Sequence, residues 1–124
     1  MKPYQNAKTE GERLAKQYAN LETVSQIDFF NGLESYYSVL GQDKNQKSIA
    51  VLIEKNGQKI YVYQLESGIS QEKAEAVVRE KGATEIDKIT FGRYADKPVW
   101  EVQSGGNYYL VDFETGVILE KEKQ

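Results

Sequence analysis

The chain contains neither cysteine nor histidine. Without them it can form no disulfide, no thiolate nucleophile and no zinc-finger ligand set. A Ser-His-Asp catalytic triad is excluded as well. These absences do not identify a compartment, because cytoplasmic proteins and exported bacterial proteins can both lack thiols.

Long apolar runs and an excess of positive charge are also missing. No run approaches the roughly 20 apolar residues that span a bilayer, and no signal-peptide core is present. The 16 basic and 19 acidic residues give a net charge of −3. A nucleic-acid binder normally shows a basic face, so we expect no nucleic-acid partner. Met1 is either a native beginning or a start placed where a membrane anchor has been removed.

The segment 67–82 divides the 124 residues almost in half and has the pattern of a short helix with both ends marked. Ser70 suits the N-cap, and Gly82 suits the left-handed stop. Between them, Ala74, Val77 and Val78 form an apolar stripe at helical spacing. The pattern predicts a helix over residues 70–81.

Before this helix the sequence predicts one longer helix and four strands. Residues 3–20 have a helical pattern with Gly11 on the apolar face, which indicates that another segment approaches closely there. Packing on a strand is the expected explanation, and the alternative is a helix that continues from an upstream membrane anchor. The pairs Asn31-Gly32 and Asn56-Gly57 are hairpin signals. The strand-like segments are residues 22–30, 35–41, 48–55 and 60–63.

After the helix the pattern repeats in shortened form. We expect Trp100 to lie in the core, between its sheet and the 70–81 helix. The predicted turns are residues 95–98, 104–107 and 114–116. The predicted strands are residues 86–94, 99–103, 108–113 and 117–120, followed by a solvated tail at 121–124.

The two halves align loosely, and a helix followed by strands is therefore present twice. The repeat predicts an α+β fold of two tandem units, residues 1–64 and 65–124. Each unit is a helix packed on an antiparallel sheet of about four strands. The residues that correspond are Ile27 with Ile89, Tyr37 with Trp100, Val39 with Val102, and Gly57 with Gly116.

No spacing in the sequence identifies a reaction. Glu34, Asp43 and Asp96 lie in predicted loops, where solvated surface charge is the default interpretation. Gly105-Gly106 lacks the Lys-Ser/Thr that follows in a phosphate loop and lies between two strands. We therefore predict no catalytic residue, no cofactor and no metal site.

Tyrosine supplies the candidate binding residues. The chain has nine tyrosines, and this residue type is enriched at binding hot spots. Tyr36, Tyr61, Tyr63 and Tyr108 fall opposite the helix-covered faces and could line an exposed partner-binding surface. Strand propensity alone also explains them, and they could instead cover the other unit.

Four stretches of the second half resemble a PepSY-type module. They are Ile69-Ser70 through Ala74 and Val77, Trp100-Glu101-Val102, Tyr109-Leu110-Val111-Asp112, and Thr115-Gly116-Val117-Ile118. From Lys2-Pro3-Tyr4 onward, the full chain is similar to the extracytoplasmic part of TseB-like (YpmB-type) cell-wall elongation regulators of Gram-positive bacteria.

This resemblance implies two tandem cystatin-like units on the extracytoplasmic face of the bacterial cell membrane, held by a single-pass N-terminal anchor that is absent from this chain. It also implies a penicillin-binding protein, or another protein of cell-wall synthesis, as partner. The stretch Gln103-Ser104-Gly105-Gly106 differs from the Gln-x-Val-x-Gly inhibitor loop of cystatins, so protease inhibition by that loop is not expected.

Three hypotheses from different classes follow. The leading one is a non-enzymatic protein-interaction module that regulates peptidoglycan synthesis and cell-wall elongation. The alternative is a binding or inhibitory domain that acts on an extracytoplasmic peptidase. An enzyme is the third, and the missing histidine and cysteine and the lack of a motif disfavour it.

Overall fold

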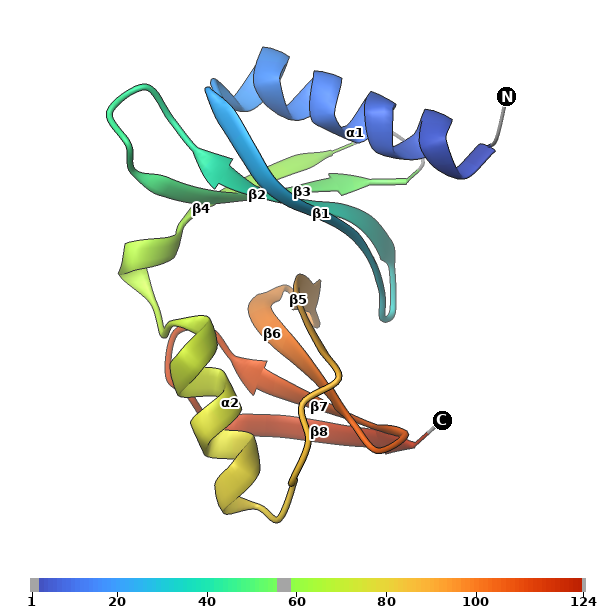
Figure 1. The fold of residues 1–124 in the computed structure, drawn as a ribbon, viewed down its shortest axis with the longest axis vertical. Coiled ribbons are helices and arrows are strands. Elements are labelled where there is room, and N and C mark those ends of the chain that lie inside the picture. The colour runs from blue at the N-terminus through green and yellow to red at the C-terminus, as the bar shows by residue number, and fades with distance from the viewer. Residues whose placement is uncertain (1–2, 56–58, 124) are drawn as a thin grey trace. The chain divides into compact units, whose positions relative to one another are not determined.

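The computed structural model describes the backbone of residues 3–55 and 59–123 and the side chains of residues 9–55 and 59–119. The chain divides into two compact units, Met1–Leu65 and Glu66–Gln124, called here the N-terminal and C-terminal units. The elements are α1 (Pro3–Ala19), β1 (Thr23–Asn31), β2 (Ser35–Gln42), β3 (Ser48–Glu54), β4 (Ile60–Gln64), the 3-10 helix η1 (Leu65–Ser67), α2 (Gln71–Glu80), β5 (Lys88–Tyr94), β6 (Lys97–Ser104), β7 (Asn107–Asp112) and β8 (Ile118–Lys123) (Figure 1).

Each unit contains one four-stranded antiparallel sheet in which neighbours in sequence are neighbours in space. The orders are β1-β2-β3-β4 and β5-β6-β7-β8, as expected for strands joined by short hairpin connections. The predicted α+β fold, with a helix and a four-stranded antiparallel sheet in each half, is confirmed. Within the described residues, no helix has the length and apolar character needed to cross a membrane.

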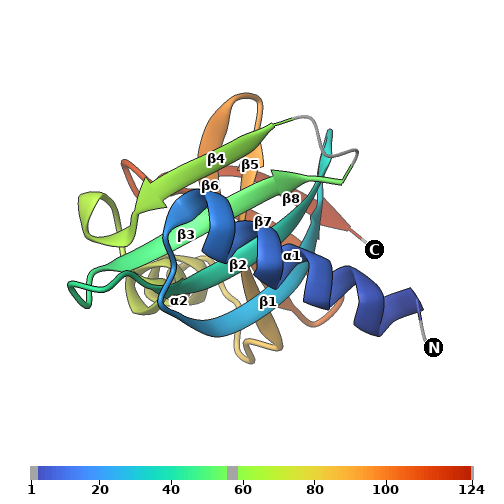
Figure 2. The same cartoon turned by 90° about the horizontal axis from the view of Figure 1, so that it is seen from above.

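The core of the N-terminal unit forms where α1 lies over the strands of its sheet (Figure 2). Gly11, Ala15 and Ala19 recur every four residues, so they form one narrow ridge along the helix. A Cβ atom built on Gly11 would lie 3.5 Å from the Cβ atom of Tyr37, which confirms the close approach of a strand. The buried residues that pack with this ridge are Leu21, Val39, Ile49, Val51 and Ile53.

In the C-terminal unit, α2 has the ends that its sequence predicts. The Ser70 hydroxyl accepts a hydrogen bond from the Lys73 N–H at 3.0 Å, so the N-cap is confirmed. Ala74 and Val78 are buried, and Val77 is half-buried. Gly82 has a φ of +107°, which is the left-handed conformation expected just after a helix.

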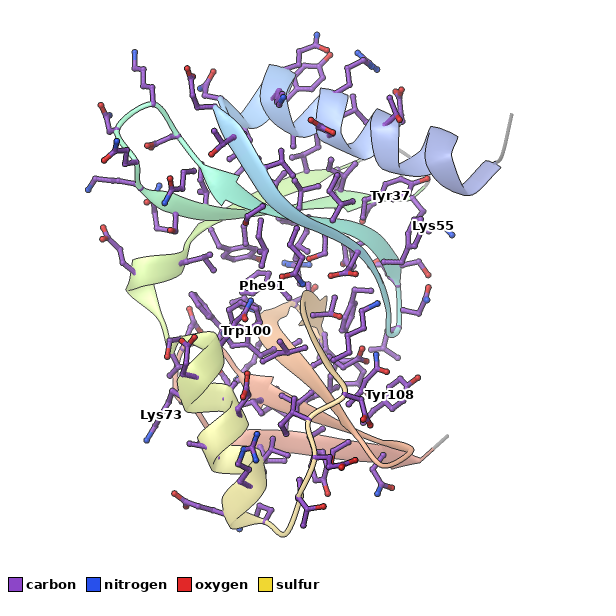
Figure 3. The ribbon with its side chains drawn as sticks, viewed as in Figure 1. Tyr37, Lys55, Lys73, Phe91, Trp100 and Tyr108 are labelled. Carbon is purple, nitrogen blue, oxygen red and sulfur yellow. The ribbon has the colours of Figure 1, made fainter. Side chains whose placement is uncertain are left out.

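Three aromatic rings occupy the core of the C-terminal unit. Trp100 is 2% exposed, and its ring centroid lies 5.0 Å from that of Phe91 (Figure 3) and 6.4 Å from that of Phe113. The Trp100 indole N–H donates to the carbonyl of Ile69 at 3.0 Å, and the Ile69 N–H donates to the Phe113 carbonyl at 2.8 Å. Trp100 is therefore a core residue, as predicted, and it holds the segment that leads into α2.

Three predicted boundaries are wrong. Strand β8 continues to Lys123, with Tyr109 opposite Lys121 and Asn107 opposite Lys123, so a paired strand replaces most of the expected tail. Pairing with β7 satisfies the backbone, which lets an edge strand of alternating charge extend. The turn after β5 consists of Ala95 and Asp96 alone, both with positive φ, and β6 already begins at Lys97.

The remaining differences are smaller. Ile86, expected in the strand, lies before β5, because pairing with β6 begins only at Lys88. Its side chain is half-buried. No pattern in the sequence predicts η1, which is a single turn of three residues. The Asn56-Gly57 turn, the correspondence of Gly57 with Gly116 and the end of the predicted tail at Gln124 lie outside the described residues.

Candidate functional site

Three of the four predicted tyrosines share one face of the N-terminal sheet. Tyr36 comes from β2, whereas Tyr61 and Tyr63 come from β4. The register places Tyr36 opposite Glu54, and it places Tyr61 and Tyr63 opposite β3 residues of that same face. The core residues that pack with α1 alternate with them, so this face, called here the tyrosine face, lies opposite the helix as predicted.

Aromatic rings cross the tyrosine face from strand to strand. The Tyr36 ring centroid lies 6.3 Å from that of Phe30 in β1 and 6.2 Å from that of Tyr61 in β4, where the rings meet edge to face. Tyr61 and Tyr63 are half-buried, but Tyr36 is only 2% exposed. The exposed position expected for Tyr36 is therefore wrong: the side chain is buried and lies beside the Phe30 and Tyr61 rings. The partner-binding role of the tyrosines stays a prediction.

Tyr108 belongs to the C-terminal unit and to a different sheet. It is half-buried in β7, where it pairs with Gln103 of β6 and Glu122 of β8. Its neighbour Tyr109 pairs with Val102, which lies on the same side of β6 as Trp100. Tyr108 therefore points to the side opposite the aromatic core, as predicted, and it forms no part of the tyrosine face.

A small acidic hollow adjoins the β1–β2 hairpin. Its volume is about 260 Å³, and it is lined by Glu34, Ser35, Glu54 and Lys55. The Lys55 ammonium lies 5.2 Å from the centroid of the Phe29 ring, and that ring packs against Tyr37 at 5.2 Å (Figure 3). Small-molecule pockets usually enclose about 300–1,000 Å³, so this hollow is too small to indicate a ligand by itself.

Of the three loop carboxylates considered as acid–base candidates, Asp43 and Asp96 form hydrogen bonds or ion pairs with nearby residues. Asp43 accepts the N–H groups of Asn45 and Lys47 at 2.8 and 3.0 Å. Asp96 pairs with Arg93 at 3.3 Å, and its side chain is 91% exposed. Glu34 is exposed in the β1–β2 connection. Over the described residues, no three His, Cys, Asp or Glu side chains are grouped so that they could hold a metal ion.

Asp112 has a structural role like that of Asp43. Its carboxylate accepts the N–H groups of Glu114 and Thr115 at 2.8 and 3.2 Å, and Lys97 approaches it at 3.7 Å. Because its side chain is 3% exposed, these donors compensate for its burial. Its position is explained by the turn before β8, and no reaction is needed to account for it.

One pair of charged residues on the surface of α1, Glu10 and Arg13, has shifted pKa values. The Arg13 guanidinium donates two hydrogen bonds to the Glu10 carboxylate, at 2.5 and 3.2 Å. These bonds hold the pKa of Glu10 below its ordinary value and raise the pKa of Arg13. The pair is exposed on α1, so it supports the helix and indicates no chemistry.

Comparison with known sequences points to one family. The model of the "Cell wall elongation regulator TseB-like domain" matches residues 10–54. A protein of Bacillus subtilis (strain 168), named "Probable cell wall elongation regulator TseB", is 34% identical over 113 residues. The aligned region covers 86% of this chain and 70% of that protein.

Two solved structures have a similar fold. The YpmB protein from Bacillus subtilis superposes with a TM-score of 0.79 and 27% sequence identity, over the whole length of both chains. A protein of Clostridium difficile 630, assigned as a lipoprotein, has a TM-score of 0.51 and 14% identity. The second match covers 98% of this chain and 93% of the other, and at that identity it shows a likeness of fold alone.

Proposed function

The chain belongs to the family of TseB-like cell wall elongation regulators, and from this premise we propose that it regulates peptidoglycan synthesis by binding a penicillin-binding protein. The observation that carries the proposal is the 34% identity to a named regulator of cell-wall elongation, across 86% of the chain. Because peptidoglycan is assembled outside the membrane, the extracytoplasmic face is the proposed place of action. A single-pass anchor preceding residue 1 stays a prediction.

We infer that the protein acts by contact and has no reaction of its own. Asp43 and Asp112 accept backbone N–H groups that fix turns, which favours a structural role over acid–base work. Regulation by binding a partner also requires neither cysteine nor histidine, the two residue types that the chain lacks. The cystatin-like description of both units and the PepSY-type description of the second stay predictions.

The proposed interface is the tyrosine face, with Tyr61 and Tyr63 as its accessible members. A half-buried tyrosine can bury further area on binding, and it loses little rotamer freedom when it does. Tyr36 has almost no accessible surface to offer. Its proposed role is to support the Tyr61 ring, which lies 6.2 Å away. Tyr108 is kept as a separate candidate on the C-terminal sheet.

Partner capture with matched tyrosine variants tests this proposal. The purified protein is immobilised, incubated with detergent-solubilised membranes of a Gram-positive bacterium, and the captured proteins are probed with a fluorescent penicillin. We expect Tyr61→Ser and Tyr63→Ser to lower capture about tenfold each, as for hot-spot residues. The control is Tyr18→Ser, which removes a tyrosine that is 60% exposed on α1 and should leave capture unchanged.

Each alternative predicts a different result. Unchanged capture by folded Tyr61→Ser and Tyr63→Ser proteins would exclude the tyrosine face, and a loss with Tyr108→Ser alone would move the interface to the C-terminal sheet. Capture of a peptidase whose activity falls on binding would favour the alternative hypothesis of an inhibitory domain. Turnover of a peptide or glycan by the purified protein would contradict the non-enzymatic mechanism.

A further inference from the structure

A second and larger hollow lies in the N-terminal unit. Its volume is about 460 Å³, within the range usual for small-ligand sites. It lies where the end of α1, the residues that follow and the β2–β3 loop come together. All of its lining residues fall within residues 10–54, the segment that matches the family model. Apart from Leu21, the lining is polar and consists of Lys16, Asn20, Glu22, Asp43, Lys44 and Asn45.

The charges that line this hollow balance but do not pair with one another. Lys16 and Lys44 are cationic, and Glu22 and Asp43 are anionic. In the part of the chain that the structure describes, no ion pair joins either lysine to either of these carboxylates. Lys16 instead contacts Glu12 at 3.1 Å, with both side chains more than 40% exposed. Such an exposed pair contributes little, so a ligand can compete with it.

Hydrogen bonds donated by backbone N–H groups hold the two walls of the hollow in place. One oxygen of Asp43 accepts the N–H groups of Asn45 and Lys47 at 2.8 and 3.0 Å, and the Asp43 carbonyl accepts the Gln46 N–H at 2.9 Å. The Glu22 N–H donates to the carbonyl of Gln42 at 2.8 Å, which ties the opposite wall to the start of this loop. The site is therefore largely formed before any ligand arrives, which lowers the entropy lost on binding.

The end of α1 adds a partial negative charge to the hollow. The helix ends at Ala19, and Asn20 adopts a left-handed φ of 58°. The last carbonyl groups of a helix have no partner within it, and together they carry about half a negative charge. An ammonium group is favoured at this end.

We propose that this hollow binds a small peptide that carries both free ammonium and free carboxylate groups. Lys16 and Lys44 bind the carboxylates, whereas Asp43, Glu22 and the carbonyl end of α1 bind the ammonium groups. The stem peptide of peptidoglycan has this chemistry, with amino and carboxylate groups on a short chain. The choice of a wall peptide rests on the proposed function, whereas the zwitterionic character rests on the lining alone.

The experiment is a titration of the full, ¹⁵N-labelled chain with the synthetic stem tetrapeptide L-Ala-γ-D-Glu-L-Lys-D-Ala, followed by amide chemical shifts. We expect saturable shifts at residues 20–22 and 43–45, with a dissociation constant of about 1 mM, as suits an open and polar hollow. The N-acetylated peptide amide, which lacks the terminal charges, should bind at least about fivefold more weakly.

Two variants remove one charge each and keep the fold. Asp43→Asn retains the side-chain carbonyl that accepts from Asn45 and Lys47, so the loop should persist while the anionic partner is lost. Lys44→Gln removes a cation that lies on the exposed loop. We expect each to raise the dissociation constant about fivefold or more. Lys47→Gln, a charge change in the same loop but outside the lining, is the control and should bind like the parent.

Three results would overturn the proposal. The first is the absence of shifts at residues 20–22 and 43–45, and the second is equal binding of the N-acetylated amide. The third is equal binding of an unrelated zwitterionic dipeptide, Gly-Lys, which would exclude the wall peptide as the specific ligand. The titration contains no partner protein, so a negative result would not affect the conclusion from the capture of a penicillin-binding protein. A failed capture would likewise leave the titration valid.

Discussion

The two units bury an equivalent pair of aromatic residues to different extents. In the N-terminal unit, Phe29 of β1 is opposite Tyr37 of β2, and both rings are half-buried with centroids 5.2 Å apart. In the C-terminal unit, Phe91 of β5 is opposite Trp100 of β6, and both are buried with centroids 5.0 Å apart. The same cross-strand position thus serves as a half-exposed pair in one unit and as the centre of the core in the other.

The two helices also differ in how they are held on their sheets. α1 has 17 residues and approaches its sheet through the small residues Gly11, Ala15 and Ala19, so contact is spread along the helix. α2 has only 10 residues, and a large ring fixes the segment before it through the bond from Trp100 to Ile69. A long helix can rely on many close contacts, whereas a short helix depends on a few strong ones.

The largest expected effect on stability comes from removing the Trp100 side chain. Trp100→Ala should lower the free energy of unfolding by about 3–5 kcal/mol, because it opens a cavity in a closed core. The equivalent change, Tyr37→Ala, should cost only about 1–2 kcal/mol, since that ring is half-buried. Urea unfolding followed by circular dichroism measures both, because Trp100 is the single tryptophan and its fluorescence is lost in the variant. If both variants lost the same free energy of unfolding, the aromatic pair would be equally important in the two units, which would contradict this comparison.

Replacing glycine with alanine should destabilise the protein at Gly68 but not at Gly11. A Cβ atom on Gly68, which precedes α2, would lie 2.5–2.6 Å from two ring carbons of Phe113 and would meet its carbonyl oxygen as well. Gly68→Ala should therefore destabilise the protein by about 1–3 kcal/mol. Gly11→Ala meets only ordinary contacts with Tyr37 and should be neutral, or stabilise α1 by up to about 1 kcal/mol. Thermal midpoints from circular dichroism decide the signs, and a lower midpoint for Gly11→Ala would show that the ridge tolerates no methyl group.

The N-cap of α2 should make the next largest contribution to stability. Ser70→Ala removes the acceptor of the Lys73 N–H and should cost about 1 kcal/mol. Ser70→Asp, which keeps an oxygen at that position, is the matched control and should remain close to the parent. Denaturant midpoints of the three proteins test this. A Ser70→Ala protein as stable as the parent would indicate that Trp100 alone secures the start of α2.

The smallest effect should come from the Glu10–Arg13 pair on α1. The pKa of Glu10 is lowered in the folded state by its hydrogen bonds to Arg13, so the pair stabilises the fold above the pKa of the unfolded chain. That contribution disappears as the pH falls through the lowered pKa of the folded state. Glu10→Gln should therefore be slightly less stable than the parent at pH 7 and equally stable at strongly acidic pH. Denaturant unfolding of both proteins at pH 7 and at acidic pH, with and without 1 M salt, measures this difference in stability. A difference that becomes larger in acid would contradict the prediction.

Sequence by itself determined the local features of both units. The helix at residues 70–81, its serine cap and its glycine stop depend on residues within a few positions of one another. The face on which each tyrosine lies follows from strict alternation along a strand, which is also local. These predictions are confirmed by the Ser70 bond, the φ of Gly82 and the pairing registers. The division into domains 1–64 and 65–124 stays a prediction.

Only the tertiary structure decided the features that depend on segments distant in sequence. Tyr36 is buried and lies beside rings from β1 and β4, and β8 extends to Lys123 because it pairs with β7. The larger hollow combines Lys16, Glu22 and Lys44 from three segments, none of which has a recognisable motif. Its charges become a site only when packing of α1 on the sheet brings them together, because a local pattern fixes the direction of a side chain but not its neighbours.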